Sequence, residues 1–215
     1  MRNQHSIAIN SGGWWSPVED GEVYTFSAEQ IAKSISKLCR FTGHTGVFYS
    51  VAEHSVAVSR MVPEELALEA LMHDAHEMLI GDMAYPLKQY LKAFEQYQRM
   101  EKKAESDVRT SQGLPIADSA EVQLADRYMA LIELHYLLDV RDTEDEMYDM
   151  AMSCVEHNKD IIPVGRLPIG AEHNFLNRYE EITGGASYVS DISVVEIPEV
   201  AEIKEESEVI GGQTL

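Results

Sequence analysis

The sequence predicts an all-α fold, in which a single helical bundle is preceded by a short hairpin or extended arm and followed by a flexible acidic tail. Segments with apolar residues at helical spacing follow one another from Ser27 to Thr183, and several open with residues that cap a helix. The chain has 215 residues, 45% of them hydrophobic, which is enough for one core and short for two. We therefore expect an arm over residues 1–26, one helical domain over 27–185 and a tail over 186–215.

The arm is expected to form a hairpin or to stay extended. Its segments SIAIN and WWSPVEDGEVYTF alternate in polarity, and a Ser-Gly-Gly turn signal lies between them. The first helix then begins at Ser27, which forms a capping box with Gln30, and is expected to reach about Leu38. A second capping box, Ser50 with Glu53, opens the helix SVAEHSVAVSRM.

Proline and glycine residues bound the helices that follow. Pro63 has a first-turn position, and its helix is expected to run through EELALEALMHDAHEMLI and to stop at Gly81. A Gly-Leu-Pro sequence at 113–115 breaks the pattern, and Thr143 with Glu146 caps a later helix. These signals predict helices over 63–80, 88–110, 119–138, 143–159 and 172–183, the last ended by two glycines.

Charge and composition exclude several classes of protein. The 17 basic and 37 acidic residues give a formal net charge of -20, and residues 187–215 hold seven of the acidic residues and one lysine. Because phosphate neutralisation needs clustered Lys and Arg, we expect neither a nucleic acid polymer nor a membrane as a partner. No window has the apolar length of a membrane span, and the first residues lack the apolar run of a signal peptide, which predicts a cytoplasmic protein.

Four residues on three expected helices have side chains that bind divalent metals. His54 lies in the first turn of one helix, His73 and Asp74 are adjacent on the next, and Asp126 lies in the helix DRYMALIELHYLL. Two imidazoles and two carboxylates suit Mn, Fe, Co or Zn without selecting one of them.

Helical spacing places these polar residues on apolar faces. The two faces are Leu66-Ala70-His73-Glu77 and Val122-Asp126-Met129-Glu133-Tyr136. A single interior histidine is usually a hydrogen-bonded core residue, and a single aspartate near a helix start is usually a cap. Unpartnered His and Glu facing a core would be costly, so the grouping of His73, Asp74 and Glu77 within five residues favours a functional site.

At these residues the sequence resembles a known superfamily. The segments YSVAEHS, LEALMHDAHEMLIGDMAYPLK and LADRYMALIE look like the HD-domain phosphohydrolases, which are all-helical and are named after a His, His-Asp, Asp metal set. The longer pattern, HD followed by Ala-x-Glu, Gly-Asp and Pro-x-Lys, is similar to the bacterial 5'-deoxynucleotidases and the phage dATP triphosphohydrolases. The resemblance covers roughly residues 14–136 and implies an HD-domain helical bundle.

The resemblance implies roles for the matching residues at the centre of the site. The metal ligands would be His54, His73, Asp74 and Asp126. Glu77 would act as a general acid/base or orient the hydrolytic water. Asp82 would be a carboxylate that supports the ligands or contacts the substrate.

Substrate contacts are implied on both sides of the HD pair. Arg40 and Phe41 resemble an Arg-aromatic pair that contacts phosphate and nucleoside, and Lys88 would be a second phosphate contact. His44, in the RFTGHTG loop, either contacts a phosphate or leaving group or is an ordinary loop histidine. His76 stands where small residues are usual, so it either faces outward or lies near the leaving group.

Two hydrolytic reactions fit such a site. We expect a dATP triphosphohydrolase that releases deoxynucleoside and triphosphate and is phage-encoded, because SGGWW and CRFTGHTGVFYSVAEHS look more like the phage members; it would act on the dATP pool in the host cytoplasm. The alternative is a 5'-deoxynucleotidase acting on dNMPs, and a second alternative is a nucleotide-binding sensor without turnover. Trp14 or Trp15 either stacks on a purine or fastens the arm to the helical body.

The expected partners are a small-molecule deoxynucleotide, a divalent metal ion and a second copy of the chain. Zn, Co or Mn is expected at the site, and Mg is compatible with it. A homo-oligomer is expected from the hairpin arm and the apolar helical surface, and the resemblance also implies one.

Overall fold

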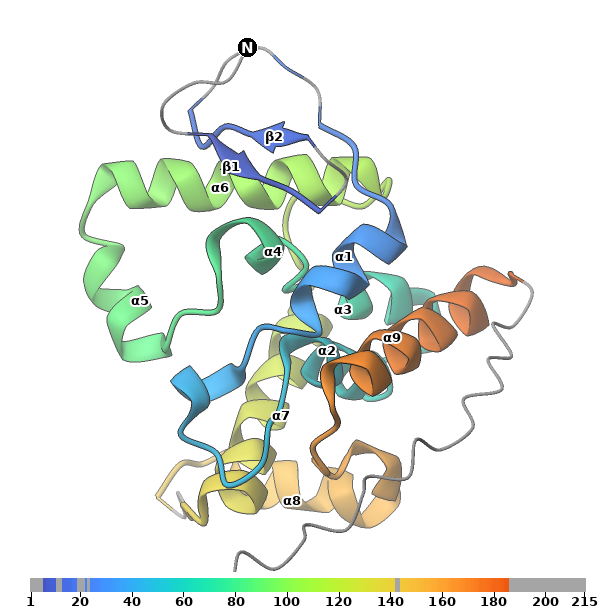
Figure 1. Cartoon of the computed structure of the whole chain (residues 1–215). Coiled ribbons are helices and arrows are strands. Elements are labelled where there is room, and N and C mark those ends of the chain that lie inside the picture. Colours follow the sequence, from blue (N-terminus) through green and yellow to red (C-terminus); the bar gives the residue numbers. More distant parts are fainter. Residues whose placement is uncertain (1–5, 11–12, 19–21, 23, 142–143, 186–215) are drawn as a thin grey trace, which may run out of the picture.

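The structure is a computed structural model and describes residues 6–10, 13–18, 22, 24–141 and 144–185. Helices dominate these residues, and their only strands form one two-stranded hairpin, which confirms the all-α prediction. Figure 1 shows the hairpin lying across α6 (Glu95–Ser111) at one end of the helical body. The expected acidic tail, 186–215, lies outside the described residues.

A single buried tryptophan fastens the hairpin to the body. Strand β1 (Ile7–Ala8) pairs antiparallel with β2 (Trp14–Trp15), whose two tryptophans point to opposite faces. Trp15 is fully buried, and its Nε1 donates to Asp107 on α6 at 2.7 Å. The ammonium of Lys103 lies 5.8 Å from the Trp15 ring centroid. Trp14, on the other face, is exposed.

Helix α2 (Val51–Ser59) is the centre of the fold, and all nine of its residues are buried. Its predicted capping box is present: Ser50 Oγ accepts from the Glu53 amide, and Glu53 Oε2 accepts from the Ser50 amide at 3.2 Å. A helix buried on every side has no solvent for its polar side chains, so a charged or imidazole group left there without a partner would be costly. Glu53 and His54 therefore have to be paired with other elements.

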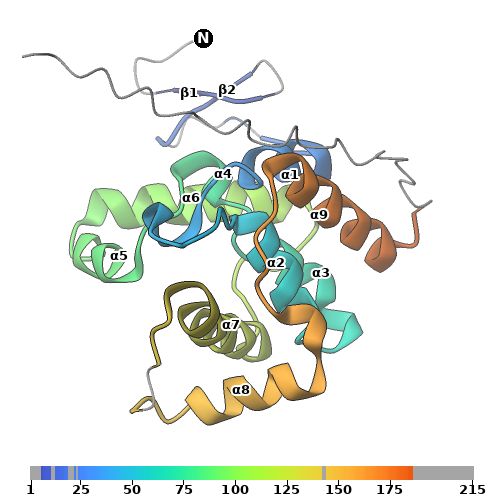
Figure 2. The same cartoon turned by 60° about the horizontal axis from the view of Figure 1, so that its bottom comes forward.

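Two hydrophobic cores meet at α2. Figure 2 shows α2 and α3 (Ala67–Met72) between two groups of helices, with α1 (Ala28–Ile35), α4 (Glu77–Ile80) and α6 on one side and α7 (Ala120–Leu138) and α8 (Tyr148–His157) on the other. The first core contains Ile31, Leu71 and Phe175, the last from α9 (Pro168–Thr183). The second contains Met129 and Val155. The polar residues discussed below lie where these two cores adjoin.

The sequence predicted one continuous helix over residues 63–80, and this prediction is wrong. Residues Glu64–Leu66 form a 3-10 turn, α3 follows, and residues 73–76 are a tight turn before α4. In this turn the amides of Ala75 and Glu77 bond carbonyls three residues back, and the His73 ring bonds the Ala70 carbonyl at 2.7 Å. An imidazole that competes for a helix carbonyl explains why periodicity alone missed the break.

Other helix boundaries also differ from the sequence prediction. The predicted helix 88–110 is two helices, α5 (Tyr85–Leu91) and α6, because Phe94 between them has an extended backbone. Helix α8 begins at Tyr148 instead of Thr143, which lies outside the described residues, and Asp145 caps the turn before it by accepting from the Met147 amide at 2.8 Å. Helix α1 ends three residues early, and α9 begins four residues early at a first-turn proline.

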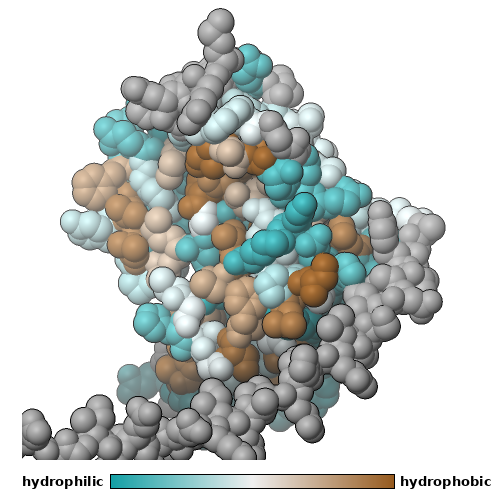
Figure 3. Space-filling view, in the orientation of Figure 1, coloured by the Kyte–Doolittle hydropathy of each residue, from teal (hydrophilic) through white to brown (hydrophobic). Residues whose placement is uncertain are grey.

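The surface of α5 is unusually apolar. Figure 3 shows hydrophobic side chains gathered over this helix, and its exposed residues include Tyr85, Leu87 and Tyr90, with Phe94 just beyond its end. Across the described residues, no helix has both the length and the apolar character needed to cross a membrane.

Candidate metal centre

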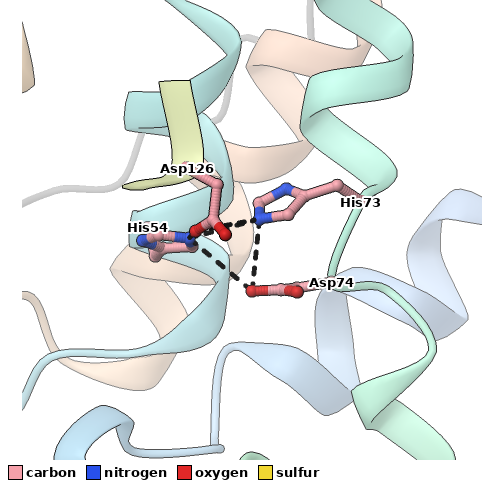
Figure 4. Close-up of side chains that lie close together, drawn as sticks. All are labelled: His54, His73, Asp74 and Asp126. Atoms are coloured by element: carbon pink, nitrogen blue, oxygen red, sulfur yellow. Dashed lines mark hydrogen bonds and ion pairs between the residues drawn. The ribbon is translucent and has the colours of Figure 1, made fainter. Parts of the chain in front are cut away.

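Four side chains from α2, the turn after α3, and α7 converge at one point. Each of His54, His73, Asp74 and Asp126 offers one ligand atom, and these atoms all lie within 4.8 Å of one another. Figure 4 shows the side chains pointing toward one another. The Nε2 atoms of the two histidines are 3.2 Å apart, and His54 Nε2 is 3.1 Å from Asp126 Oδ1. The structure thus brings together the four residues that the sequence grouped.

Both histidines are oriented by the nitrogen that does not face this point. His54 Nδ1 lies 2.6 Å from Glu133 Oε1, and His73 Nδ1 lies 2.7 Å from the Ala70 carbonyl oxygen. An acceptor at Nδ1 places the ring proton there and leaves the Nε2 lone pair free for a metal. Two unprotonated Nε2 atoms at 3.2 Å repel each other unless a cation lies between them. The donor chemistry therefore fits a divalent metal ion.

Glu133 is the functional residue that the sequence did not single out. It was recognised only as one member of the α7 stripe, two turns beyond Asp126 on the same face. Its carboxylate is fully buried and accepts from His54 through Oε1 and from Arg40 through Oε2, at 3.1 Å from Arg40 Nε and 3.0 Å from Nη2. One carboxylate thus fixes the orientation of both a candidate metal ligand and the site's arginine.

The charges of the ligands stabilise one another. Burial alone would raise the pKa of Asp74, but His73, His54 and Arg40 hold that pKa well below its usual range. Burial opposes a charge on His73 too, yet Asp74 and Asp126 raise its pKa well above the ordinary value. Metal must therefore displace protons from the imidazoles, and binding should weaken in acid.

Asp126 is less buried than the stripe predicted. Its side chain is 42% exposed, whereas that of Asp74 is 17% exposed and that of His54 is fully buried. The prediction that Asp126 faces the interior is therefore only partly correct: Oδ1 contacts His54, but much of the side chain is exposed. The centre is closed by α2 and α3 and open beside α7.

Glu77 has a buried oxygen with no partner. The residue is 6% exposed, and among the described residues no donor lies within hydrogen-bond distance of its Oε2. Burial, together with the carboxylates of Asp74 and Asp82, raises the pKa of Glu77 well above its usual value. Burial likewise raises the pKa of Asp82, which follows Gly81 at the end of α4. A buried carboxyl with a raised pKa and an unused oxygen is suited to receive or donate a proton.

Arg40 lies in a loop of unusual backbone geometry. In the 3-10 turn Arg40–Gly43, Phe41 and Thr42 have positive φ angles of 54° and 55°. The guanidinium reaches inward to Glu133 and to Asp74, whose Oδ2 is 3.5 Å from Nη1, and the Phe41 ring centroid lies 5.5 Å from it. Burial opposes the charge of Arg40, but the surrounding carboxylates raise its pKa, so it stays cationic. His44, at the end of this turn, is exposed.

Two further predicted residues, Lys88 and His76, have partners of their own. Lys88 forms an ion pair with Glu101 on α6 at 2.8 Å, which raises its pKa against the effect of burial. His76 is buried and its Nδ1 lies 3.2 Å from the His73 carbonyl, so the expectation that it faces outward is wrong. Trp15 packs on α6 as described above, and Trp14 is the exposed one of the two tryptophans.

An all-helical fold that brings a His, a His-Asp pair and an Asp to one point defines the HD-domain superfamily of phosphohydrolases. The chain belongs to the 5'-deoxynucleotidase YfbR-like family, whose model matches residues 43–152, about half of the chain. The matched residues contain the four converging side chains, Glu77 and Glu133, and they begin just after Arg40.

Two similar proteins extend the comparison without adding a function. The chain is 48% identical over 103 residues to the uncharacterized protein YfdR of Escherichia coli (strain K12), a match that covers 48% of this chain and 56% of YfdR. It is 39% identical over 69 residues to the uncharacterized protein RCAP_rcc00048 of Rhodobacter capsulatus, covering 28% of this chain and 35% of that protein. The chain thus spans about half the length or less of these relatives.

Proposed function

We propose that the protein is a metal-dependent 5'-deoxynucleotidase, which removes the phosphate of deoxynucleoside monophosphates. The observation that carries the proposal is the convergence of His54, His73, Asp74 and Asp126 within 4.8 Å, in a chain of the 5'-deoxynucleotidase YfbR-like family. A bound divalent ion would supply a Lewis acid for the phosphoryl group and lower the pKa of water. The remaining chemistry belongs to the protein's own side chains.

In this proposal Arg40 and Lys88 bind the phosphate. Arg40 is held in place by Glu133, and its Nη1 is only loosely engaged by Asp74 at 3.5 Å, so that this nitrogen can take a phosphate oxygen. Lys88 would leave Glu101 for the more strongly charged phosphate. Phe41 and His44 extend from the same loop as Arg40 and are proposed to contact the nucleoside or the leaving group.

Glu77 is proposed to move the proton. Its unpartnered Oε2 can accept a hydrogen bond from the attacking water, and its raised pKa lets it pass that proton to the leaving 5'-oxygen at neutral pH. Asp82, whose charge adds to the raised pKa of Glu77, is proposed to maintain this property.

The family match favours monophosphates over the dATP triphosphohydrolase that the N-terminal segments suggested. The triphosphohydrolase expectation depends on SGGWW, which lies before residue 43, where the match begins, and on CRFTGHTGVFYSVAEHS, most of which lies inside the match. One of the two tryptophans offered for purine stacking, Trp15, has its ring buried against α6. Trp14 is the remaining candidate for that contact.

Product analysis tests the proposal. The protein is stripped of metal, supplied singly with Mn, Co, Zn or Mg, and incubated with panels of dNMPs and dNTPs. We expect inorganic phosphate and deoxynucleoside from dNMPs. Intact triphosphate released from dATP would establish the triphosphohydrolase instead, and no turnover with any metal would leave a nucleotide-binding sensor.

The proposed unit of function is the helical domain 27–185, with the arm as its attachment at one end and the tail as a segment outside it. The protein is also proposed to form a homo-oligomer through apolar helical surface, of which α5 is the most exposed part. Light scattering coupled to size exclusion measures this directly: a monomer at all concentrations would contradict it.

A further inference from the structure

A second cavity of about 410 Å³ lies against a different face of α2 from the metal centre. Glu53, Val56, Ala57 and Arg60 line it, at the i, i+3, i+4, i+7 spacing of one helix face, and none of the four converging residues does. Its other walls come from Lys159–Ile161, the connection to α9, and α9 itself. Figure 2 shows this connection passing beside α2. The volume is within the range of small-molecule sites.

The rim of the cavity is cationic. Three cations, Arg60, Lys159 and Arg166, line it beside one exposed carboxylate, that of Asp160, in a protein whose net charge is -20. The two arginines are only weakly neutralised: Arg166 Nη1 is 3.4 Å from Glu53 and Arg60 Nη1 is 3.8 Å from Asp160. Within the part of the chain that the structure describes, Lys159 has no ion pair. Three cations around one opening are suited to a phosphate group.

The floor and walls have a different chemistry. Val56, Ile162 and Val164 supply apolar walls, and the buried floor is formed by Tyr49, Glu53 and Ile161. The Glu53 carboxylate beneath the rim is 1% exposed and already accepts hydrogen bonds from Ser50 and Arg166, so the apolar walls are the surface open to the inner part of a ligand. An anionic rim ligand alone, such as inorganic phosphate, would leave this inner part unused.

We propose that this cavity is a second ligand site, separate from the metal centre, which binds a nucleoside monophosphate. The phosphate would pair with Lys159, Arg166 and Arg60 at the rim, and the base would lie against the apolar walls. The proposal uses no residue of the metal centre and does not depend on the hydrolytic activity proposed above.

Calorimetric titration of the full chain with AMP, in the presence of a chelator, tests the site. Lys159→Gln and Arg166→Gln should each weaken AMP binding by about tenfold, because each removes a charge-assisted hydrogen bond. Asp74→Ala, which alters the metal centre, should leave this binding event unchanged. Lys33→Gln, an exposed lysine on α1, is the matched charge control. Adenosine and inorganic phosphate should each bind more weakly than AMP.

The variants also separate a binding effect from a folding defect. Arg166 faces the buried Glu53, so Arg166→Gln can lower stability, whereas Lys159 is exposed and its replacement should not change thermal unfolding. If AMP binding is lost in Asp74→Ala and intact in Lys159→Gln, the nucleotide binds at the metal centre and the proposal is refuted. Absence of any AMP binding by the chelated wild-type protein refutes it as well.

Discussion

Replacement of Glu133 by glutamine should damage the fold and the metal centre together. The carboxylate accepts three hydrogen bonds, from Arg40 Nε at 3.1 Å, Arg40 Nη2 at 3.0 Å and His54 Nδ1 at 2.6 Å. Glutamine has one acceptor oxygen, and its amide nitrogen must face one of these donors. The substitution therefore removes the nearest counter-charge of the Arg40 guanidinium, which keeps only Asp74 at 3.5 Å, and deprives either Arg40 or His54 of its acceptor.

The size of the expected loss in stability follows from the burial of the Glu133–Arg40 ion pair. The side chain of Glu133 is 0% exposed and that of Arg40 is 12% exposed, so solvent cannot replace the lost partner. Removing one member of a buried ion pair costs about 3–5 kcal/mol in the free energy of unfolding. Loss of the group that orients a metal-binding histidine should weaken metal affinity by about 10- to 100-fold.

Two measurements check these values. Urea unfolding in the presence of a chelator gives the change in stability without metal, and competition against a chromophoric chelator gives the affinity for Zn, Co or Mn. Glu121→Gln, an exposed substitution in the first turn of the same helix, is the matched control. Wild-type stability and metal affinity in Glu133→Gln would refute the assignment of Glu133 as the partner of His54 and Arg40.

Three further substitutions test other parts of the argument. Asp74→Ala should abolish hydrolysis and leave far-ultraviolet circular dichroism nearly unchanged, and retained turnover would show that Asp74 is not a ligand. Trp15→Ala should lower the free energy of unfolding by about 3–5 kcal/mol, while kcat of the folded protein stays the same because the ring contacts α6; a drop in kcat without a loss of stability would contradict this. In chelator, wild-type stability should fall as pH rises from the ordinary pKa of glutamate through the raised pKa of Glu77, since burial favours the protonated carboxyl in the folded state. Glu77→Gln should make this fall smaller, leaving the part due to Asp82 and His73, and should abolish hydrolysis; an unchanged pH profile of stability would contradict the assignment.

Local signals in the sequence were sufficient to predict where several helices begin. The capping boxes at Ser27 and Ser50 predicted two helix starts that the structure has. Each signal acts within one helical turn, where the side chain and the amide that it bonds are three residues apart. Helix interruptions were missed because they depend on a side chain competing with the backbone, as His73 does at the Ala70 carbonyl.

The sequence offered Trp14 and Trp15 for the same two roles and could not say which of them faces the body. That choice depends on Asp107, which lies 92 residues further along the chain and accepts from the Trp15 ring. The same limit applied to Glu133: helical spacing placed it beside Asp126, while its partner Arg40 is 93 residues away.

The sequence by itself determined which side chains are available for a metal and placed His54 and Asp126 on their helices, because residue identity and helical spacing are local properties. Only the tertiary structure decided which atoms meet. The packing of α7 against α2 brings Asp126 to within 3.1 Å of His54 across 72 residues, and the Glu133 and Ala70 acceptors determine that both histidines present Nε2. These contacts depend on the burial of α2 between two cores, where leaving the His54 imidazole without partners would be costly.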